Sequence, residues 1–299
     1  MREPNFFIIG APKCGTTSVY FWLSEHPEIY MSPVKEPNFF SGDICRKQKV
    51  ESIEGYKKLF EAANPDHKVV GEASTTYMMS ETAVPKIEKR YDTPKYLVLI
   101  RNPVSMAHSL YRHLVATGAE HIGNFEKAWN MSNMRREEKR VNSIPISPKM
   151  LDYKKACKLG EQIERLKKVV RNKRLKVIKI EDIKENTQKE YKKIINFLGL
   201  KSYGRTKFDK KNQAKKRTSG TLHRMVRKVG NLSNRVKKRL GIPVYRGTGI
   251  TKKIIKANTK KTKKPKLNKE MKREMKKYFE EDIKKLQKVT NINLSNWLS

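Results

Sequence analysis

Apolar residues in the first two-thirds of the chain form short runs that alternate with stretches of helical spacing. The runs predict strands at Asn5–Ile9, Lys68–Glu72, Lys95–Ile100 and Leu175–Ile180. The helical spacing predicts helices at Thr16–Leu23, Pro103–Ala116, Glu161–Val170 and Tyr191–Leu198. Because largely apolar strands that alternate with helices are buried on both faces, this pattern predicts an α/β fold, a central parallel sheet flanked by helices in three layers.

The last third of the chain has a different pattern. Apolar residues at helical spacing run from Leu222 to Leu240 within a basic stretch, and a loop rich in Gly, Thr and Lys follows from Arg246 to Pro265. A final helix is expected from Asn268, a good N-cap, with an apolar face that continues to about residue 288. We therefore expect a single domain over residues 1–299, with a basic helical and loop subregion at about 201–267 and a C-terminal helix at about 268–288.

Positive charge is concentrated in the same region. The chain of 299 residues has 68 Lys and Arg against 30 Asp and Glu, a formal net charge of +38. Residues 201–267 hold 24 of these Lys and Arg and one acid, Asp209. A field of this sign attracts anions, so nucleic acid, anionic lipid, an acidic polysaccharide or a polyanionic cofactor are candidate ligands. A lysine-rich composition with solvated side chains is the other interpretation.

Cysteine usage and hydropathy exclude several classes of protein. Cys14, Cys45 and Cys157 cannot all pair and have no His at zinc-ligand intervals, so the sequence predicts reduced thiols and no structural metal. The longest apolar runs, Phe6–Ile9 and Tyr96–Ile100, are far shorter than the roughly 18 residues of a membrane-spanning helix. We therefore expect no transmembrane segment and a cytoplasmic location.

The segment after the first predicted strand has the clearest chemistry. A strand, a glycine-bounded loop and a helix N-terminus form a phosphate site, because backbone N–H groups and the helix dipole point at one anion. The frame from Gly10 to Thr17 resembles the Walker A loop, with Thr16 at the lysine position and a lysine within the loop instead. The fold is therefore expected to be P-loop-like. The expected anion ligands in this loop are Lys13, Cys14, Gly15, Thr16, Thr17 and Ser18.

The end of the predicted strand Lys95–Ile100 indicates the kind of ligand. A nucleotide kinase needs a carboxylate there to hold Mg²⁺, whereas this strand is followed by Arg101. Ser109 lies eight residues further on, about two helical turns along the next helix, where its hydroxyl could reach the same anion. This arrangement indicates an anion neutralised by protein cations, without a metal. A P-loop kinase, which would require Mg²⁺, is the disfavoured alternative.

These segments resemble the sulfotransferases that use 3′-phosphoadenosine 5′-phosphosulfate (PAPS). The 5′-phosphosulfate loop of that family is similar to Pro12–Ser18, and its 3′-phosphate motif is similar to Arg101–Ser109. Further similarities are Lys35-Glu36-Pro37-Asn38-Phe39-Phe40, Gly71-Glu72-Ala73-Ser74, the predicted strand end Ile180-Glu181-Asp182, Phe197-Leu198-Gly199-Leu200 and Asn296-Trp297. The resemblance covers nearly the whole chain in the order of the family, and it implies one sulfotransferase domain with PAPS as co-substrate.

The resemblance implies a role for each candidate residue. Lys13 would donate to the leaving 5′-phosphate, assisted by the backbone of the loop. Arg101 and Ser109 would hold the 3′-phosphate, over which the basic loop Lys260–Lys264 would close. Glu36 would be the base that takes the proton of the acceptor, although before a proline it could also be a plain turn carboxylate. No histidine falls in a motif of this kind.

The acceptor stays open. The resemblance is strongest to the carbohydrate-type and bacterial branch and implies a glycan or glycolipid, yet heparan-modifying members usually carry Lys where this chain has Ala73. A nucleic-acid-binding protein is the alternative suggested by charge, but residues 201–267 hold only three aromatic residues for base stacking. The basic stripe Leu222–Leu240 has two open interpretations, packing on the sheet or peripheral contact with an anionic surface.

Overall fold

The computed structural model describes residues 2–45, 48–134, 148–209 and 267–298, together with the backbone of strands at 215–217 and 259–261. The chain divides into two compact units, residues 1–211 with 267–299 and residues 212–266. In the second unit, β6 (Lys215–Arg217) pairs antiparallel with β7 (Thr259–Lys261). The prediction of a loop at 246–265 was wrong for Thr259–Lys261, which form β7 because they pair with β6. The rest of that segment and the predicted helix at 222–240 lie outside the described residues.

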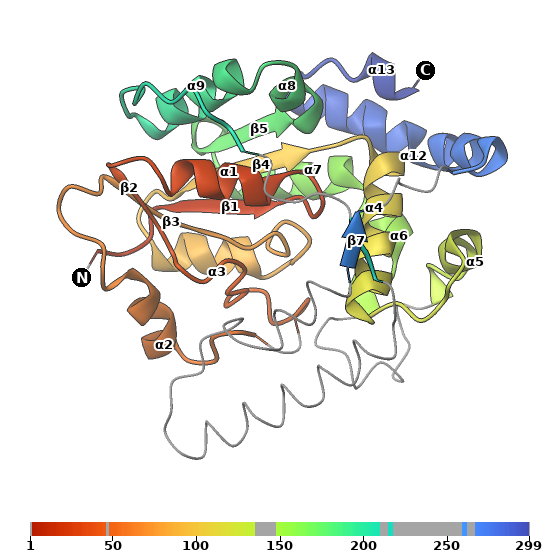
Figure 1. The fold of residues 1–299 in the computed structure, drawn as a ribbon, viewed down its shortest axis with the longest axis horizontal. Coiled ribbons are helices and arrows are strands. Elements are labelled where there is room, and N and C mark those ends of the chain that lie inside the picture. The colour runs from red at the N-terminus through yellow and green to blue at the C-terminus, as the bar shows by residue number, and fades with distance from the viewer. Residues whose placement is uncertain are drawn as a thin grey trace. The chain divides into compact units, whose positions relative to one another are not determined.

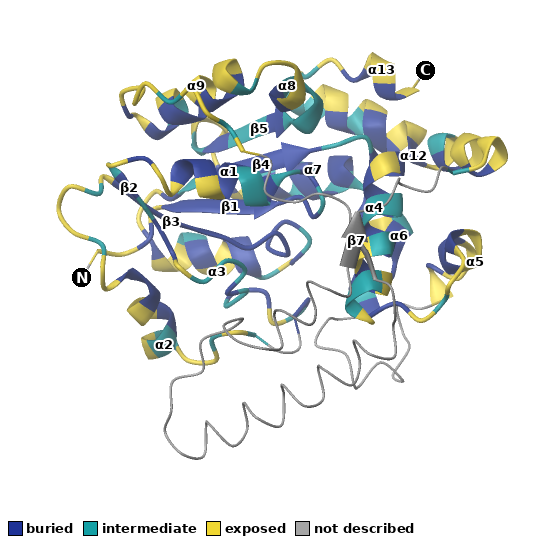
Figure 2. Cartoon of the chain, in the orientation of Figure 1, coloured by how far each residue is buried: buried dark blue, intermediate teal, exposed yellow. Residues whose placement is uncertain are grey.

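The first unit is built on a five-stranded sheet whose neighbouring strands are all parallel (Figure 1). Its order is β2-β3-β1-β4-β5, with β1 at Phe6–Gly10, β2 at Ile29–Met31, β3 at Val69–Ala73, β4 at Lys95–Ile100 and β5 at Leu175–Lys179. Every residue of the central strands β1 and β3 is buried (Figure 2). The predicted α/β fold with a central parallel sheet is thereby confirmed. Of the five strands in this sheet, only the short edge strand β2 was not predicted.

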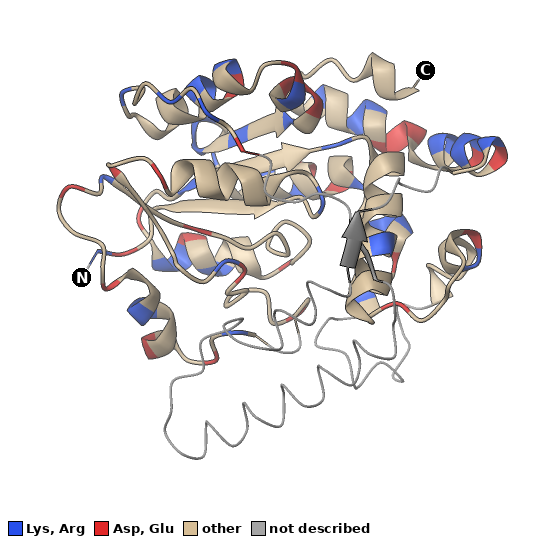
Figure 3. Cartoon of the chain, in the orientation of Figure 1, with Lys and Arg blue, Asp and Glu red and all other residues tan. Residues whose placement is uncertain are grey.

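Helices cover both faces of this sheet. They are α1 (Thr16–Leu23), α2 (Ile53–Lys57), α3 (Ala83–Arg90), α4 (Pro103–Thr117), α5 (Phe125–Asn130), α6 (Tyr153–Ala156), α7 (Leu159–Val169), α8 (Ile180–Glu185), α9 (Thr187–Leu198), α12 (Lys269–Thr290) and α13 (Ser295–Leu298). In Figure 1, α1 crosses in front of β1. The connection from β1 to β2 runs across the sheet in one direction, and the later connections run in the opposite direction. Because crossovers between parallel strands are right-handed, the helices of the later connections lie on the face opposite to α1. Two of these helices, α3 and α7, contact each other. Charged residues lie mainly on the outer surfaces of the helices (Figure 3).

Local capping signals fix where the longer helices begin. The Asn102 side chain accepts hydrogen bonds from the first-turn N–H groups of α4, Pro103 occupies its first position, and Gly118 ends it in the left-handed conformation. Asn268 likewise accepts from the N–H of Met271 at the start of α12. Several predicted boundaries shift by one to four residues, as in β1, β3 and α9. At the end of β5, Ile180 begins α8 rather than ending the strand, so Glu181 lies in the first turn of a helix. Within the described residues, no helix is both long and apolar enough to span a membrane.

The C-terminal helix α12 caps α7 through one buried carboxylate. Asp282 accepts hydrogen bonds of 2.9 Å from the N–H groups of Gly160 and Glu161 in the first turn of α7. Burial raises the pKa of Asp282, and these two bonds oppose that shift. A Cβ on Gly160 would lie 2.3 Å from the Asp282 carbonyl oxygen, so only glycine allows the two helices to approach this closely.

We expect Gly160→Ala to lower the free energy of unfolding by about 1–3 kcal/mol, because overpacking at a helix contact forces the backbones apart. Urea denaturation followed by circular dichroism measures this change. Gly123→Ala is the matched control, since a Cβ at Gly123 meets nothing within 4 Å. Equal stabilities of the two variants would contradict the close approach.

Candidate active site

The loop between β1 and α1 is shaped to bind an anion. Gly15, the N-cap of α1, has φ 91°, and a Cβ there would lie 2.4 Å from Ile180 Cδ1, so this position requires glycine. The first-turn N–H groups of Thr16 and Thr17 have no acceptor among the contacts that the structure describes, as expected for a helix N-terminus. Cys14 contributes only backbone, because its thiol is fully buried against Pro12 and Met106, and burial raises its pKa to about 12.

Lys13 stands at the centre of this loop in a left-handed conformation, with φ 65°. Burial lowers the pKa of its ammonium, and the positive charges of Arg101 and Lys35 lower it further, while the Glu36 carboxylate opposes the shift. Among the described residues its Nζ has neither a hydrogen bond nor an ion pair. The side chain is therefore a half-buried cation within electrostatic reach of two other cations and one carboxylate, and its donors are available to a ligand.

Arg101 connects the end of β4 to the loop. Its Nη1 donates a 3.1 Å hydrogen bond to the carbonyl oxygen of Lys13, and its buried Nε has no partner. The side-chain hydroxyl of Ser109, a half-buried residue of α4, has no hydrogen bond among the described contacts. Unused guanidinium, ammonium and backbone donors thus gather at one edge of the sheet. Such a donor set fits a nucleotide with two separate anionic groups.

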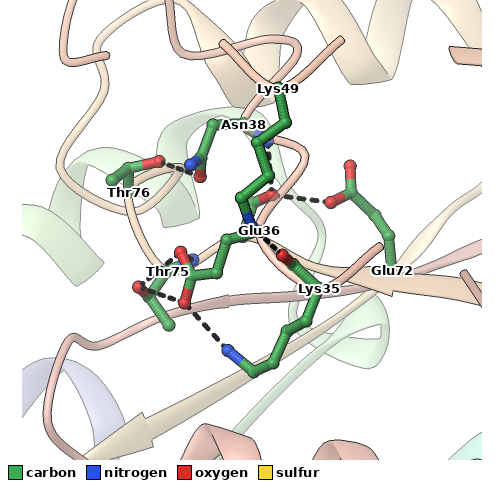
Figure 4. A network of polar contacts seen from close by, with 8 residues as sticks. Lys35, Glu36, Asn38, Lys49, Glu72, Thr75 and Thr76 are labelled. Atoms are coloured by element: carbon green, nitrogen blue, oxygen red, sulfur yellow. Dashed lines mark hydrogen bonds and ion pairs between the residues drawn. The ribbon is translucent and has the colours of Figure 1, made fainter. Parts of the chain in front are cut away.

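Glu36 lies in the loop after β2, beside the end of β3. Its Oε1 accepts a 2.8 Å bond from the Lys35 ammonium, and both carboxylate oxygens lie 3.1 Å from the Thr75 hydroxyl (Figure 4). The N–H of Thr75 donates to Oε2 at 3.3 Å. The Glu36 side chain keeps 29% of its surface exposed, and a carboxylate can accept about four hydrogen bonds, so room is left for an acceptor group. The carboxylate is thus oriented without being closed off.

Glu72 lies fully buried in β3 behind this loop. The hydroxyl groups of Tyr56, Tyr77 and Ser74 donate to it at 2.7–2.8 Å. Burial raises the pKa of Glu72 to about 7, and the three hydroxyl groups oppose the shift. A carboxylate enclosed in this way holds the β3 end and does not reach a substrate.

The structure brings Lys13, Glu36 and Arg101 to the same edge of the sheet, although they come from three separate segments. Sequence reasoning did not single out Lys35 or Thr75 as partners of Glu36. Lys35 is adjacent to it in the sequence, but Thr75 is 39 residues away, so no local signal could have found that contact.

The family follows from comparison with known proteins. The sulfotransferase domain family matches residues 3–290, nearly the whole chain, so the chain belongs to this family, whose sulfuryl donor is PAPS. The resemblance seen in the motifs is thereby confirmed. A sulfotransferase from Alicyclobacillus acidocaldarius is 22% identical in sequence, with a TM-score of 0.72 over 100% of both chains, which shows a shared fold.

Curated relatives match shorter segments. Membrane-associated sulfotransferase kil1 of Dictyostelium discoideum is 32% identical over 110 residues, 36% of this chain and 22% of that protein. Bifunctional heparan sulfate N-deacetylase/N-sulfotransferase 2 of Bos taurus is 32% identical over 123 residues, 39% of this chain and 14% of that protein. Carbohydrate sulfotransferase 15 of Rattus norvegicus is 28% identical over 155 residues, 38% of this chain and 28% of that protein. The matches therefore span less than a third of the length of each relative.

Proposed function

We propose that this chain transfers the sulfuryl group of PAPS to a hydroxyl or amine of a carbohydrate or glycolipid acceptor, in line and without a metal. One observation carries the proposal: Lys13, in the loop between β1 and α1, lies within electrostatic reach of Glu36, a carboxylate that Thr75 holds in a fixed orientation. Two relatives have heparan sulfate or carbohydrate in their names, which supports an acceptor of this class.

Each residue has a distinct part in this proposal. PAPS supplies the sulfuryl group on a 5′-phosphate leaving group. Lys13 and the N–H groups of Gly15, Thr16 and Thr17 stabilise the negative charge that develops on the leaving oxygen. Glu36 accepts the proton of the acceptor as it attacks. Arg101 and Ser109 bind the 3′-phosphate and so fix the position of the nucleotide.

The transfer of labelled sulfate from PAPS to a panel of glycans, glycolipids, peptides and phenols, with and without EDTA, tests this function. We expect product with glycan or glycolipid acceptors and no loss of rate in EDTA. Strict dependence on Mg²⁺, or use of ATP as donor, would instead identify a nucleotide kinase. Binding of nucleic acid without any sulfate transfer would favour a polyanion-binding protein.

Arg101→Ala is expected to weaken binding of adenosine 3′,5′-bisphosphate by about 1.5–3 kcal/mol, the scale of hydrogen bonds to a charged group. The reason is that the free donors of Arg101 are assigned to the 3′-phosphate. Isothermal titration calorimetry in EDTA measures the change. Arg171→Ala, which removes an exposed arginine ahead of β5, is the control. If adenosine 5′-phosphate lost as much affinity as the bisphosphate, Arg101 would not be recognising the 3′-phosphate.

A further inference from the structure

Two segments far apart in the sequence are held together along their length. They are residues 73–77, which continue from β3, and residues 36–41, which contain Glu36. The contacts are Glu36 N to Ala73 O (2.9 Å), Asn38 N to Ser74 Oγ (3.0 Å), Thr75 Oγ1 to Glu36 Oε1 (3.1 Å), Thr76 Oγ1 to Asn38 Oδ1 (2.9 Å) and Phe40 N to Tyr77 OH (3.4 Å). Each residue of the first segment thus binds the second.

The Glu36 loop needs this support because its backbone is unfavourable. Glu36 has φ 58° and Asn38 has φ 57°, a left-handed conformation that is energetically unfavourable for a residue other than glycine. Such a conformation persists only where surrounding contacts determine it. Ser74 provides one of these contacts, and it is itself anchored to the buried Glu72 carboxylate at 2.7 Å.

Thr75 differs from its neighbours in what it binds. Ser74 and Thr76 hold Asn38, whereas Thr75 binds the reactive end of Glu36 itself. Its hydroxyl lies 3.1 Å from both carboxylate oxygens and its N–H lies 3.3 Å from Oε2, while Lys35 holds the other side of Oε1 (Figure 4). Thr75 is 7% exposed, so water does not compete freely for these bonds. The hydroxyl and the Lys35 ammonium together set the direction in which the free carboxylate lone pairs point.

We propose that Thr75 is a positioning residue, which sets the orientation of the Glu36 carboxylate toward the acceptor. This inference rests on the proposed function, since it assigns Glu36 as the base. Thr75 touches neither donor nor acceptor in this account and acts only through Glu36. Ser74, anchored to Glu72, holds the backbone of the loop and Thr76 holds the Asn38 side chain, whereas Thr75 holds the Glu36 carboxylate.

Thr75→Val removes the hydroxyl and preserves the shape and the backbone N–H. We expect the single-turnover rate of sulfuryl transfer to fall about ten- to hundred-fold, the loss of a hydrogen bond to a charged group. The KM for PAPS and the affinity for adenosine 3′,5′-bisphosphate should change less than two-fold, because Thr75 does not contact the nucleotide. Thr75→Ser restores the hydroxyl and should recover most of the rate. Thr187→Val, which removes a hydroxyl that donates from the start of α9 to the Ile183 carbonyl oxygen in α8, is the matched control.

A double-mutant cycle separates this role from general stabilisation. In a Glu36→Gln background, Thr75→Val should lower the single-turnover rate less than three-fold, because there is no base left to orient. If Thr75→Val lowered the rate ten-fold or more in that background, the proposal would be overturned. A wild-type rate for Thr75→Val, in a protein that transfers sulfate and loses it on Glu36→Gln, would also overturn it and leave the proposed function intact.

A crystal structure of each variant gives a readout that does not depend on activity. In Thr75→Val the Glu36 carboxylate should rotate away from its position beside residue 75, and in Thr75→Ser it should stay. A carboxylate unchanged in Thr75→Val would overturn the positioning role even if no acceptor were found. Circular dichroism and melting curves establish that the variants fold, and Thr75→Ala provides a second hydroxyl-free variant if Thr75→Val does not.

Discussion

Lys13→Ala is expected to lower the rate of the chemical step by about 10²–10³, the scale of losing one preorganised donor to a developing negative charge. The structure gives the reason. The Lys13 ammonium is half-buried in the loop between β1 and α1, and among the described residues it has no partner within the protein. Burial lowers its pKa, and two neighbouring cations lower it further. A ligand that becomes more negative as the reaction proceeds would gain most from this group, because little water lies around it to screen the charge.

Single-turnover transfer from labelled PAPS measures this effect separately from product release. The KM for the acceptor should change far less than the rate, since Lys13 is assigned to the leaving group. Lys168→Ala, at an exposed position of α7, controls for the removal of one positive charge. A loss of acceptor affinity with an unchanged chemical rate would place Lys13 on the acceptor side of the reaction and contradict this assignment.

Glu36→Gln should depress the chemical rate by about 10²–10⁴, the usual contribution of a positioned general base. The amide keeps the shape of the side chain and can still accept from Thr75 and Lys35, so the loop is expected to remain in place. What is lost is the capacity to take a proton. Melting curves that match the wild type would establish that the effect is chemical.

The acidity of the acceptor provides a sharper test of the same residue. An acidic phenol is already ionised at neutral pH and needs no base. Glu36→Gln should therefore slow sulfuryl transfer to the phenol much less than transfer to an alcohol. Glu61→Gln, an exposed position after α2, is the control. An equal loss for both acceptors would mean that Glu36 contributes charge or position rather than proton transfer. Full activity with the alcohol would require another base, and the buried, three-fold hydrogen-bonded Glu72 could not reach the acceptor without rearrangement.

The sequence by itself determined the features that depend on residues close together along the chain. Short apolar runs with helices between them predicted the buried parallel strands, since alternation with helices requires both faces of a sheet to be covered. The loop from Gly10 to Thr17 was recognisable because a strand, a glycine and a helix N-terminus are contiguous. Arg101 was placed at the same site because the carboxyl ends of parallel strands meet at one edge. The helix start at Asn268 followed from capping chemistry.

Only the tertiary structure decided how these groups touch. β2 was not predicted because three residues, one of them only partly buried, carry too little pattern. The direct bond from Arg101 to the Lys13 carbonyl joins positions 88 residues apart, and the contact of Thr75 with Glu36 joins positions 39 apart. Such contacts are set by strand order and by the left-handed turns at Glu36 and Asn38, which local preferences disfavour. The candidate residues could be named from the sequence, whereas their orientation arises from packing between segments that are distant along the chain.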